Sequence, residues 1–395
     1  MSNIGILFKD FGPYHVARIE ALADALKTKE SSLFAYRFYE SSRNYAWKTM
    51  TPENAKVITL GNENASGVVE AFRVAFALGR SIRKQKIKAV FLPSYSPLPN
   101  MLCIFSAKMA GSKIILMNES WEATERASFF GRLAKHFLVR LFNSALVGGT
   151  PQKQYACAYG QLPSKVFLGY DAVDVKYYEQ QSAQWKNETP GKQPVPNLPP
   201  RYFLNLGRFV SKKNIPLLIK AYSRLLKRYP LLDIALVLVG EGEEEKALKD
   251  LVTELQVPLR EGMLSPNLSQ KNAEVVFYPF QQIDKTPFIF SRSEAFILPS
   301  LYEEWGLVVN EAMASSTTVI VSKNVGCAAD LVINGINGFQ FNPESVEQLE
   351  EILEKFVKDP MLADRLGNEG YRHIKNWGPE RFAEGAINAI AATAI

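Results

Sequence analysis

Two glutamates beside a predicted helix start are the residues whose type and spacing most suggest chemistry. Glu303 and Glu311 lie in the run PSLYEEWGLVVNEAMA. Residues 295–298 predict a strand that ends at Pro299, and a helical pattern opens near Gly306. Backbone N–H groups at a helix start favour an anion, so a phosphate there, with carboxylates holding nearby hydroxyls, would make a sugar-nucleotide site. The alternative is that Glu303 is only a first-turn acid stabilised by the helix dipole.

A basic loop earlier in the chain is a candidate phosphate-binding element. The segment LGRFVSKKN, residues 206–214, lies between a predicted strand and a predicted helix. Gly207 permits a tight turn, Arg208 offers a planar bidentate fork, and Lys213 adds a second positive charge. Two cations at this place suit a diphosphate. Exposed basic loop residues without a ligand are the other interpretation.

Length and composition indicate a globular protein of two domains. A chain of 395 residues is too long for one ordinary core. No apolar run approaches the ~20 residues of a membrane span, and the first residues predict a strand rather than a signal peptide. Three cysteines and three histidines are scattered without metal-type or redox spacing. We therefore expect reduced thiols, no disulfide framework, no metal site and a cytoplasmic location.

Short apolar strands alternate with helical patterns along both halves. In the first half, strands are predicted at residues 4–8, 89–92, 113–117 and 144–147, and helices at 16–27, 101–110 and 129–142. In the second half, strands are predicted at residues 202–206, 234–239, 275–278, 295–298 and 319–322, and helices at 215–229, 244–255 and 306–314. This alternation predicts parallel, doubly wound sheets, whose active residues lie in loops at the carboxyl ends of strands. In the first half those loops are residues 9–15, 93–99 and 118–125.

A polar, proline-rich stretch near the middle predicts the domain boundary. The predicted organisation is an N-terminal domain at 1–185, a linker at 186–200, a second domain at 201–376, and a C-terminal helix at 377–395 that packs back on the N-terminal domain. The expected fold class is α/β, with two Rossmann-like doubly wound parallel-sheet domains.

The order of the motifs in the second half carries a family resemblance. They are Gly207-Arg208 with Lys213, then Gly240-Glu241-Gly242, then Pro299-Ser300 with Glu303, then Glu311-Ala312-Met313-Ala314. This half resembles the donor domain of retaining glycosyltransferases of family 4, which have the GT-B fold. The resemblance implies an acceptor-side domain at 1–185 and a donor-binding domain at 201–376 that face each other across a cleft. The resemblance covers about residues 202–341 well and the first half more loosely.

The resemblance implies a role for each matching position. Arg208 and Lys213 would hold the donor diphosphate, the amides of Gly306, Leu307 and Val308 would cap its distal phosphate, Glu303 would contact the transferred sugar, Glu311 would contact the ribose, and Phe280 would lie against the base. Three places depart from the family pattern. Ser316 begins a segment where the family has Gly-x-Pro, Asn214 stands where a glycine usually follows the lysine, and Pro279 stands where a glycine is frequent.

The acceptor side is expected in the first half. Glu119 follows the predicted strand at 113–117 and is the candidate base or acceptor-orienting group. His15, with Gly12 in the same loop, could touch the acceptor or a donor phosphate. The alternatives are that Glu119 only pairs with nearby cations and that His15 is a structural residue at a helix start.

The resemblance implies transfer of a hexose-type sugar with retention, in cell-surface polysaccharide or glycoconjugate synthesis. Leaving diphosphate and incoming hydroxyl would meet on one face of the sugar, so placement and charge would supply most of the catalysis. No metal or other cofactor is expected, because protein cations neutralise the diphosphate. The alternatives are a GT-B epimerase or phosphorylase, and a non-catalytic protein that binds anionic lipid or nucleic acid.

Positive charge is concentrated in one stretch. Residues 71–170 contain fourteen Lys or Arg and three acids, although the whole chain has a net charge of only +6. An anionic partner, or merely a solvated face, would explain this. The basic amphipathic segment 127–142 could rest on an anionic membrane or simply cover a sheet. The expected partners are a nucleotide-sugar donor, a sugar or lipid-linked acceptor and the inner face of a membrane, but not nucleic acid.

Overall fold

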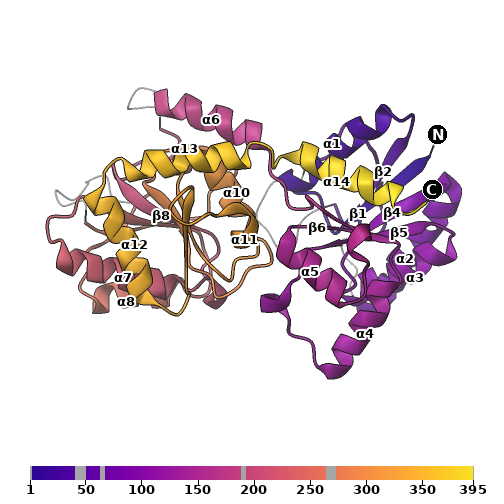
Figure 1. The fold of residues 1–395 in the computed structure, drawn as a ribbon, viewed down its shortest axis with the longest axis horizontal. Coiled ribbons are helices and arrows are strands. Elements are labelled where there is room, and N and C mark those ends of the chain that lie inside the picture. The colour runs from indigo at the N-terminus through magenta and orange to yellow at the C-terminus, as the bar shows by residue number, and fades with distance from the viewer. Residues whose placement is uncertain (1, 41–49, 63–66, 188–192, 264–272, 395) are drawn as a thin grey trace. The chain divides into compact units, whose positions relative to one another are not determined.

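The chain forms two compact units in the computed structural model, which describes residues 2–40, 50–62, 67–187, 193–263 and 273–394. The first unit is Met1–Asp174 with Asn376–Ile395, and the second is Val175–Lys375 (Figure 1). Each contains a seven-stranded parallel sheet among the described residues. This confirms the predicted fold class of two doubly wound domains. None of the helices in the described ranges has the length and apolar character that crossing a membrane requires.

The first unit is a sheet with helices on both faces. Its strands are β1 (Asn3–Phe8), β2 (Ser32–Arg37), β3 (Lys56–Thr59), β4 (Ile87–Pro93), β5 (Lys113–Asn118), β6 (Ser144–Val147) and β7 (Val166–Leu168). Its helices are α1 (Pro13–Lys27), α2 (Gly67–Gln85), α3 (Leu98–Met109), α4 (Phe129–Arg140), α5 (Thr150–Ala158) and α14 (Pro379–Ala391). The strand order is β3-β2-β1-β4-β5-β6-β7, so the direction of winding reverses between β1 and β4.

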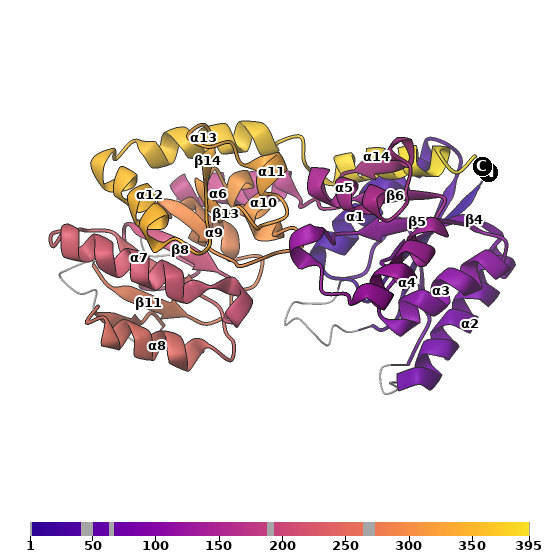
Figure 2. The ribbon, with the colours of Figure 1, turned by 60° about the horizontal axis from the view of Figure 1, so that its bottom comes forward.

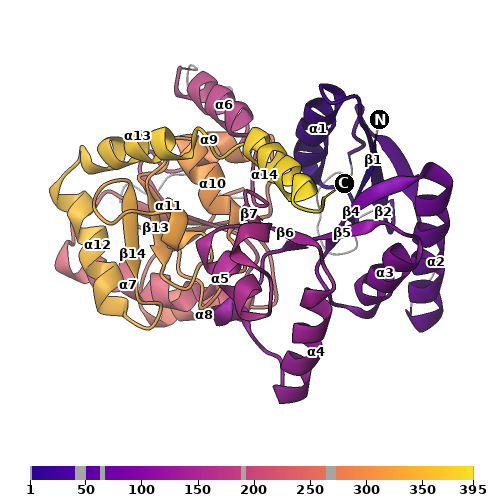
Figure 3. The same ribbon diagram turned by 45° about the vertical axis from the view of Figure 1, so that its right-hand side comes forward.

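Two apolar cores separate the layers of the first unit. Helices α2, α3, α4 and α5 contribute side chains to the core on one face of the sheet. Helices α1 and α14 contribute to the core on the other face, and Figure 3 shows these two helices next to each other. The C-terminal helix is also tied to the sheet, because Ser144 Oγ donates to the carbonyl of Ala389 over 2.8 Å. The end of the chain thus belongs to the first unit.

The second unit repeats the architecture. Its strands are β8 (Tyr202–Leu206), β9 (Ala235–Val239), β10 (Leu259–Glu261), β11 (Val275–Tyr278), β12 (Ala295–Leu298), β13 (Val319–Ser322) and β14 (Gly338–Phe341). Its helices are α6 (Val175–Asn187), α7 (Ile215–Arg228), α8 (Glu245–Glu254), α9 (Thr286–Ser291), α10 (Leu307–Ala314), α11 (Ala328–Leu331), α12 (Val346–Lys358) and α13 (Leu362–Ile374). The order β10-β11-β9-β8-β12-β13-β14 places the reversal between β8 and β12.

The domain boundary lies about one helix earlier than predicted. Helix α6 packs on the second unit, where Ser182 Oγ donates to the carbonyl of Pro287 and the Trp185 ring lies 5.4 Å from that of Phe288. The first domain therefore ends at Asp174 rather than at residue 185.

The predicted linker is also corrected. Residues 188–192 lie outside the described residues, but the segment after them is attached to the second unit. Tyr278 donates its hydroxyl to the carbonyl of Pro196, and Arg260 donates to that of Asn197. The proline-rich segment is therefore part of the second unit and is not a free linker between the two units.

Candidate active site

Two loops of the second unit meet where the strand order reverses. They are residues 207–214, after β8, and residues 299–306, after β12. The amide of Leu301 donates to the carbonyl of Lys212 over 2.8 Å, and Asn214 Nδ2 donates to the carbonyl of Pro299 over 3.2 Å. Such a reversal leaves a crevice at the carboxyl ends of the strands, which is where doubly wound folds bind ligands. The two predicted motifs are thereby brought to the expected place.

The Glu303 carboxylate is the centre of this junction. It is only 6% exposed, and Lys213 Nζ lies 2.6 Å from its Oε1. Lys212 Nζ lies 3.3 Å from Oε2, and Ser300 Oγ donates to Oε1 over 3.0 Å. Burial by itself raises the pKa of Glu303, but the two lysines outweigh it and hold the pKa below its usual value. The side chain is therefore a carboxylate that accepts hydrogen bonds.

The backbone around Glu303 is fixed from a third loop. The Glu303 amide donates to the carbonyl of Asn324, and the Glu303 carbonyl accepts from the amide of Gly326. Two residues on, the buried Trp305 donates its indole N–H to Asn310 Oδ1 over 2.9 Å. The carboxylate is therefore held in place before any ligand arrives, as a preorganised site requires.

Helix α10 begins directly after this loop. Gly306 is its N-cap with φ of +96°, and a Cβ there would lie 2.9 Å from Val325 Cγ1. A glycine is thus required for both conformation and space. Leu307 and Val308 follow in the first turn, half-buried, and Glu311 lies further along the helix, 4% exposed. The start of α10 presents the positive end of its dipole beside the lysine–glutamate cluster.

The glycines of the loop after β9 permit close contact between backbones. The Gly207 amide donates to the carbonyl of Val239, and the Phe209 amide donates to that of Glu241. A Cβ on Gly240 would lie 1.9 Å from the carbonyl oxygen of Gly207. Any side chain at residue 240 would therefore displace the loop that carries Arg208 and Lys213.

The other predicted donor residues, Arg208 and Phe280, also follow the carboxyl ends of strands of this sheet. Arg208 is exposed on the loop after β8. Phe280 follows β11 with 41% of its surface exposed, and its amide donates to Glu241 Oε1 over 3.3 Å. An exposed aromatic ring with no role in the core is available for stacking on a planar group.

Two departures from the family pattern are accommodated by the left-handed backbone conformation. Asn214 has φ of +53°, and Ser316 has φ of +56°. Asparagine adopts this conformation more readily than most residues, and here Asn214 Nδ2 also donates to the carbonyls of Pro299 and Pro343. The loop keeps a turn of the kind that a glycine would permit. The base-side departure at Pro279 has no such explanation in the structure.

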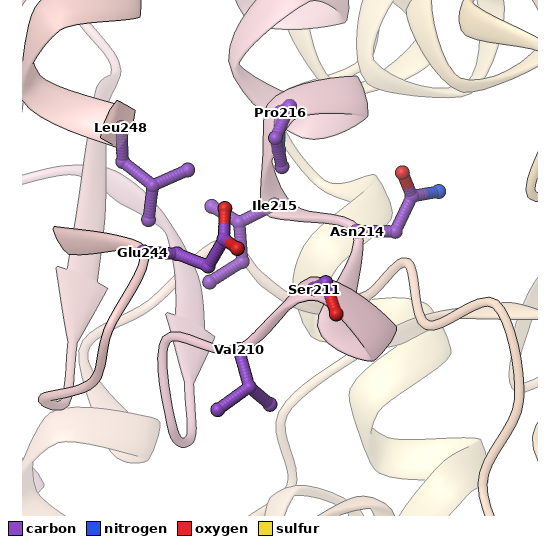
Figure 4. A pocket seen from close by; sticks show the side chains of 7 residues that line it. All are labelled: Val210, Ser211, Asn214, Ile215, Pro216, Glu244 and Leu248. Carbon is purple, nitrogen blue, oxygen red and sulfur yellow. The ribbon is translucent and has the colours of Figure 1, made fainter. Parts of the chain in front are cut away.

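A small pocket lies beside these loops, between α7 and the start of α8 (Figure 4). Its volume is about 120 Å³, and it is lined by Val210, Ser211, Asn214, Ile215, Pro216, Glu244 and Leu248. Sites for ligands of drug size usually occupy roughly 300–1,000 Å³. Glu303 and Arg208 do not line it, so we do not assign it to a nucleotide sugar.

The first unit contains a separate cluster of charged residues at the carboxyl ends of β5 and β7. Arg18 of α1 is 1% exposed, and its Nη2 lies 3.4 Å from Oδ1 of the fully buried Asp171. Burial, and then the charge of Glu119, raises the pKa of Asp171. Glu119 therefore lies next to Asp171 and Arg18 at the end of β5, half-buried. The structure thus places Glu119 beside a buried ion pair, and its action on an acceptor stays a prediction.

His15 has a structural role at the start of α1. Its Nδ1 accepts the amide N–H of Gly12 over 3.1 Å, and its ring centroid lies 4.5 Å from that of Phe8. Burial, followed by the charge of Arg18, lowers the pKa of His15 to about 3. The ring is neutral at physiological pH. The helix-start interpretation therefore has direct support, and a contact of His15 or Gly12 with substrate stays a prediction.

The depressed pKa of His15 predicts a loss of stability in mild acid. The unfolded state takes up a proton below about pH 6.5, but the folded state does not until about pH 3. Stability is thus lost as the pH falls through this window, by about 2 kcal/mol between pH 8 and pH 5. His15→Gln keeps an acceptor for the Gly12 amide without titrating. Urea unfolding at both pH values should show a smaller loss in this variant; equal losses would contradict the assignment.

Several contributing residues were missed from the sequence. Lys212 and Ser300 contact Glu303 directly, although the sequence pattern indicated a charge role for Lys213 and none for its neighbour Lys212. Asp171 lies beside Glu119 and pairs with Arg18, and an arginine at a buried position of α1 was the available signal. Across the described part of the chain, no group of three or more His, Cys, Asp or Glu side chains is arranged to hold a metal ion.

The region that contains the cluster around Glu303 is similar in sequence to known proteins. Residues 200–359 match the sequence model of the family described as glycosyl transferases group 1. An uncharacterised glycosyltransferase of Methanocaldococcus jannaschii is 28% identical over 189 residues, which is 48% of this chain and 44% of that protein. The lipopolysaccharide core biosynthesis glycosyltransferase LpsE of Rhizobium meliloti is 29% identical, over 48% of this chain and 47% of that protein. Each alignment spans about half the length of the relative.

The fold similarity extends over the whole chain. The structure of Anabaena HepE in complex with UDP-glucose superposes with a TM-score of 0.70, at 14% identity, covering 100% of both chains. At that identity the likeness establishes the fold alone. The two doubly wound units are the pair of Rossmann-like domains found in glycosyltransferases of the GT-B type.

Proposed function

We propose that this chain is a glycosyltransferase that moves a hexose-type sugar from a nucleotide-diphosphate sugar to an acceptor hydroxyl, with retention at the anomeric carbon. The cluster of Glu303, Lys213 and Lys212 beside the start of α10 carries the proposal. It lies within the region that matches the group 1 family. A UDP-sugar donor is supported by the UDP-glucose complex of the structural neighbour, and a role in polysaccharide or glycoconjugate synthesis by the name of the Rhizobium relative.

The proposed donor contacts follow from charge and hydrogen-bonding capacity. Arg208 and Lys213 neutralise the diphosphate, and the amides of Gly306, Leu307 and Val308 cap its distal phosphate. Glu303 and Glu311 accept hydrogen bonds from the hydroxyls of the sugar and the ribose, because a carboxylate can accept from two neighbouring hydroxyls at once. Phe280 lies against the base.

The proposed reaction needs no protein nucleophile. The bond between the anomeric carbon and the phosphate oxygen breaks while the acceptor oxygen bonds to the same face of that carbon. The acceptor proton passes to the leaving phosphate. Protein cations beside the negatively charged leaving phosphate, together with correct placement of the two substrates, then supply most of the rate enhancement. Glu119 is proposed to orient the acceptor in the first unit.

Two further properties belong to this proposal. We propose that the protein cations replace a divalent metal at the diphosphate, so transfer should persist in excess EDTA. We also propose a reducing compartment such as the cytoplasm. Cys103, Cys157 and Cys327, all within the described residues, are thiols rather than halves of disulfides, which supports this location.

A thermal-shift panel of UDP-, GDP- and ADP-sugars tests donor binding. A ligand at 100 times its Kd stabilises the protein by about 2.7 kcal/mol. In a unit of roughly 200 residues this should raise the melting temperature by on the order of 5–10 °C. Arg208→Ala should abolish the shift without lowering the melting temperature of the free protein, because Arg208 is exposed. Failure of every nucleotide sugar to shift the melting temperature would refute the proposal.

A further inference from the structure

Exposed apolar side chains gather on three helices of the first unit. Helices α2, α3 and α4 supply more than half of the exposed large apolar residues among the described residues. Six of these residues define what we call the α2–α4 surface: Phe72, Phe76, Phe105, Met109, Phe130 and Phe137. Phe76 and Met109 are 73% and 78% exposed, and Phe130 is 79% exposed. Soluble surfaces seldom gather so many large apolar groups without a binding role.

All three helices lie on the same face of one sheet. Each contributes residues to the core beneath that face, and Figure 2 shows α2, α3 and α4 in this layer. On α2, the buried residues Val74, Leu78 and Ile82 occupy the sheet side, and Phe72 and Phe76 point elsewhere. Each helix therefore buries one set of apolar residues against the sheet and leaves a second set exposed to solvent.

The orientation of α4 is locked by a cluster on its inner side. Lys135 Nζ lies 2.6 Å from Glu125 Oε2, which also accepts the hydroxyls of Tyr155 and Tyr159. Leu138 and Val139 are buried on the same helix. Because Lys135 and these two residues fix the inner side, Phe130 and Phe137 cannot turn toward the sheet.

Positive charge accompanies the apolar groups. Arg80, Lys84 and Arg132 are exposed on α2 and α4. Glu70 is the only acidic residue in the sequences of the three helices. It is 2% exposed, and its Oε2 lies 3.0 Å from Arg73 Nη1. These helices therefore present cations to solvent without an exposed acid of their own.

We propose that the α2–α4 surface docks on an anionic lipid bilayer. Aromatic side chains beside arginine and lysine are typical of helices that lie in the membrane interface, where the rings enter the acyl boundary and the cations meet lipid phosphates. A second copy of the chain is a poorer occupant, because equivalent patches would bring like charges together. The proposal rests on the first unit and is independent of donor chemistry in the second.

Vesicle sedimentation of the full chain, without any nucleotide sugar, tests the proposal. We expect binding to vesicles of phosphatidylcholine with 30% phosphatidylglycerol, much weaker binding to phosphatidylcholine alone, and loss of binding in high salt. Phe130→Ser combined with Phe137→Ser should weaken binding by about tenfold or more, because both rings leave the interface. Arg80→Glu combined with Lys84→Glu should do the same through charge.

A matched control uses exposed apolar residues of the second unit. Leu231 and Met361 are 96% and 64% exposed, so Leu231→Ser with Met361→Ser removes comparable groups outside the surface. This variant should bind anionic vesicles as the unmodified chain does. Absence of vesicle binding by the unmodified chain, or equal loss in the control and surface variants, would overturn the proposal. So would a dimer by light scattering that Phe130→Ser and Phe137→Ser convert to a monomer.

Discussion

Lys213→Ala is expected to lower kcat/KM for sugar transfer by about 10²–10³-fold. Its ammonium group lies 2.6 Å from Glu303 Oε1, and it is the proposed cation on the leaving diphosphate. Its removal takes away charge stabilisation of the leaving group and leaves the buried carboxylate with one lysine in place of two. The measurement is steady-state transfer with the nucleotide sugar that stabilises the protein most.

The neighbouring lysine is the matched control. Lys212 also pairs with Glu303, at 3.3 Å, but shares its charge with Glu304 at 3.2 Å. Lys212→Ala should therefore cost about tenfold or less. If the two variants lose the same activity, Lys213 has no special role at the phosphate and acts only as one of two counter-ions. A Lys213→Ala variant with unchanged activity would show that Lys213 takes no part in the reaction.

Gly240→Ala is expected to destabilise the second unit by about 3 kcal/mol or more. The added Cβ would lie 1.9 Å from the carbonyl oxygen of Gly207, which is backbone and cannot rotate away. The loop after β8 must move, and Lys213 moves with it. We expect a lower urea midpoint and a loss of donor-induced stabilisation in the same variant.

Gly335→Ala separates this clash from ordinary backbone strain. Gly335 has φ of +73°, and nothing lies within 4 Å of a Cβ placed there. Strain alone should cost about 1 kcal/mol. Comparable destabilisation by both substitutions would mean that contact between the two loop backbones is not what requires glycine at residue 240.

The ion pair at the site also bears on how a donor would bind. In the ligand-free structure Lys213 already has a partner in Glu303, so the proposed diphosphate must compete for it. Because the same carboxylate is proposed to accept from a sugar hydroxyl, the hydroxyl would take over part of the hydrogen bonding that Lys213 gives up. The pair compensates the buried charge of Glu303 and the partly buried charge of Lys213 until the ligand arrives.

The sequence determined the features that depend on local pattern. Short apolar runs between helical periods identified strands such as β8, β12 and β13, and their alternation predicted parallel sheets. The sequence also placed a tight turn at Gly207, where the structure has φ of +157°. These signals survive in sequence because they arise from neighbours within a few residues.

Only the tertiary structure decided which distant groups meet. Lys212 contacts Glu303 across 91 positions of sequence, so no local pattern could assign the second lysine to that carboxylate. Helix α6 and the proline-rich segment have the composition of a domain end and a linker, yet their side-chain contacts hold them to the second unit. Likewise, α2 contains more apolar residues than the sheet can cover, and only packing shows that Val74 and Leu78 are buried and that Phe72 and Phe76 stay in solvent. Burial and charge pairing are properties of the assembled fold, because they depend on what the chain brings alongside each residue.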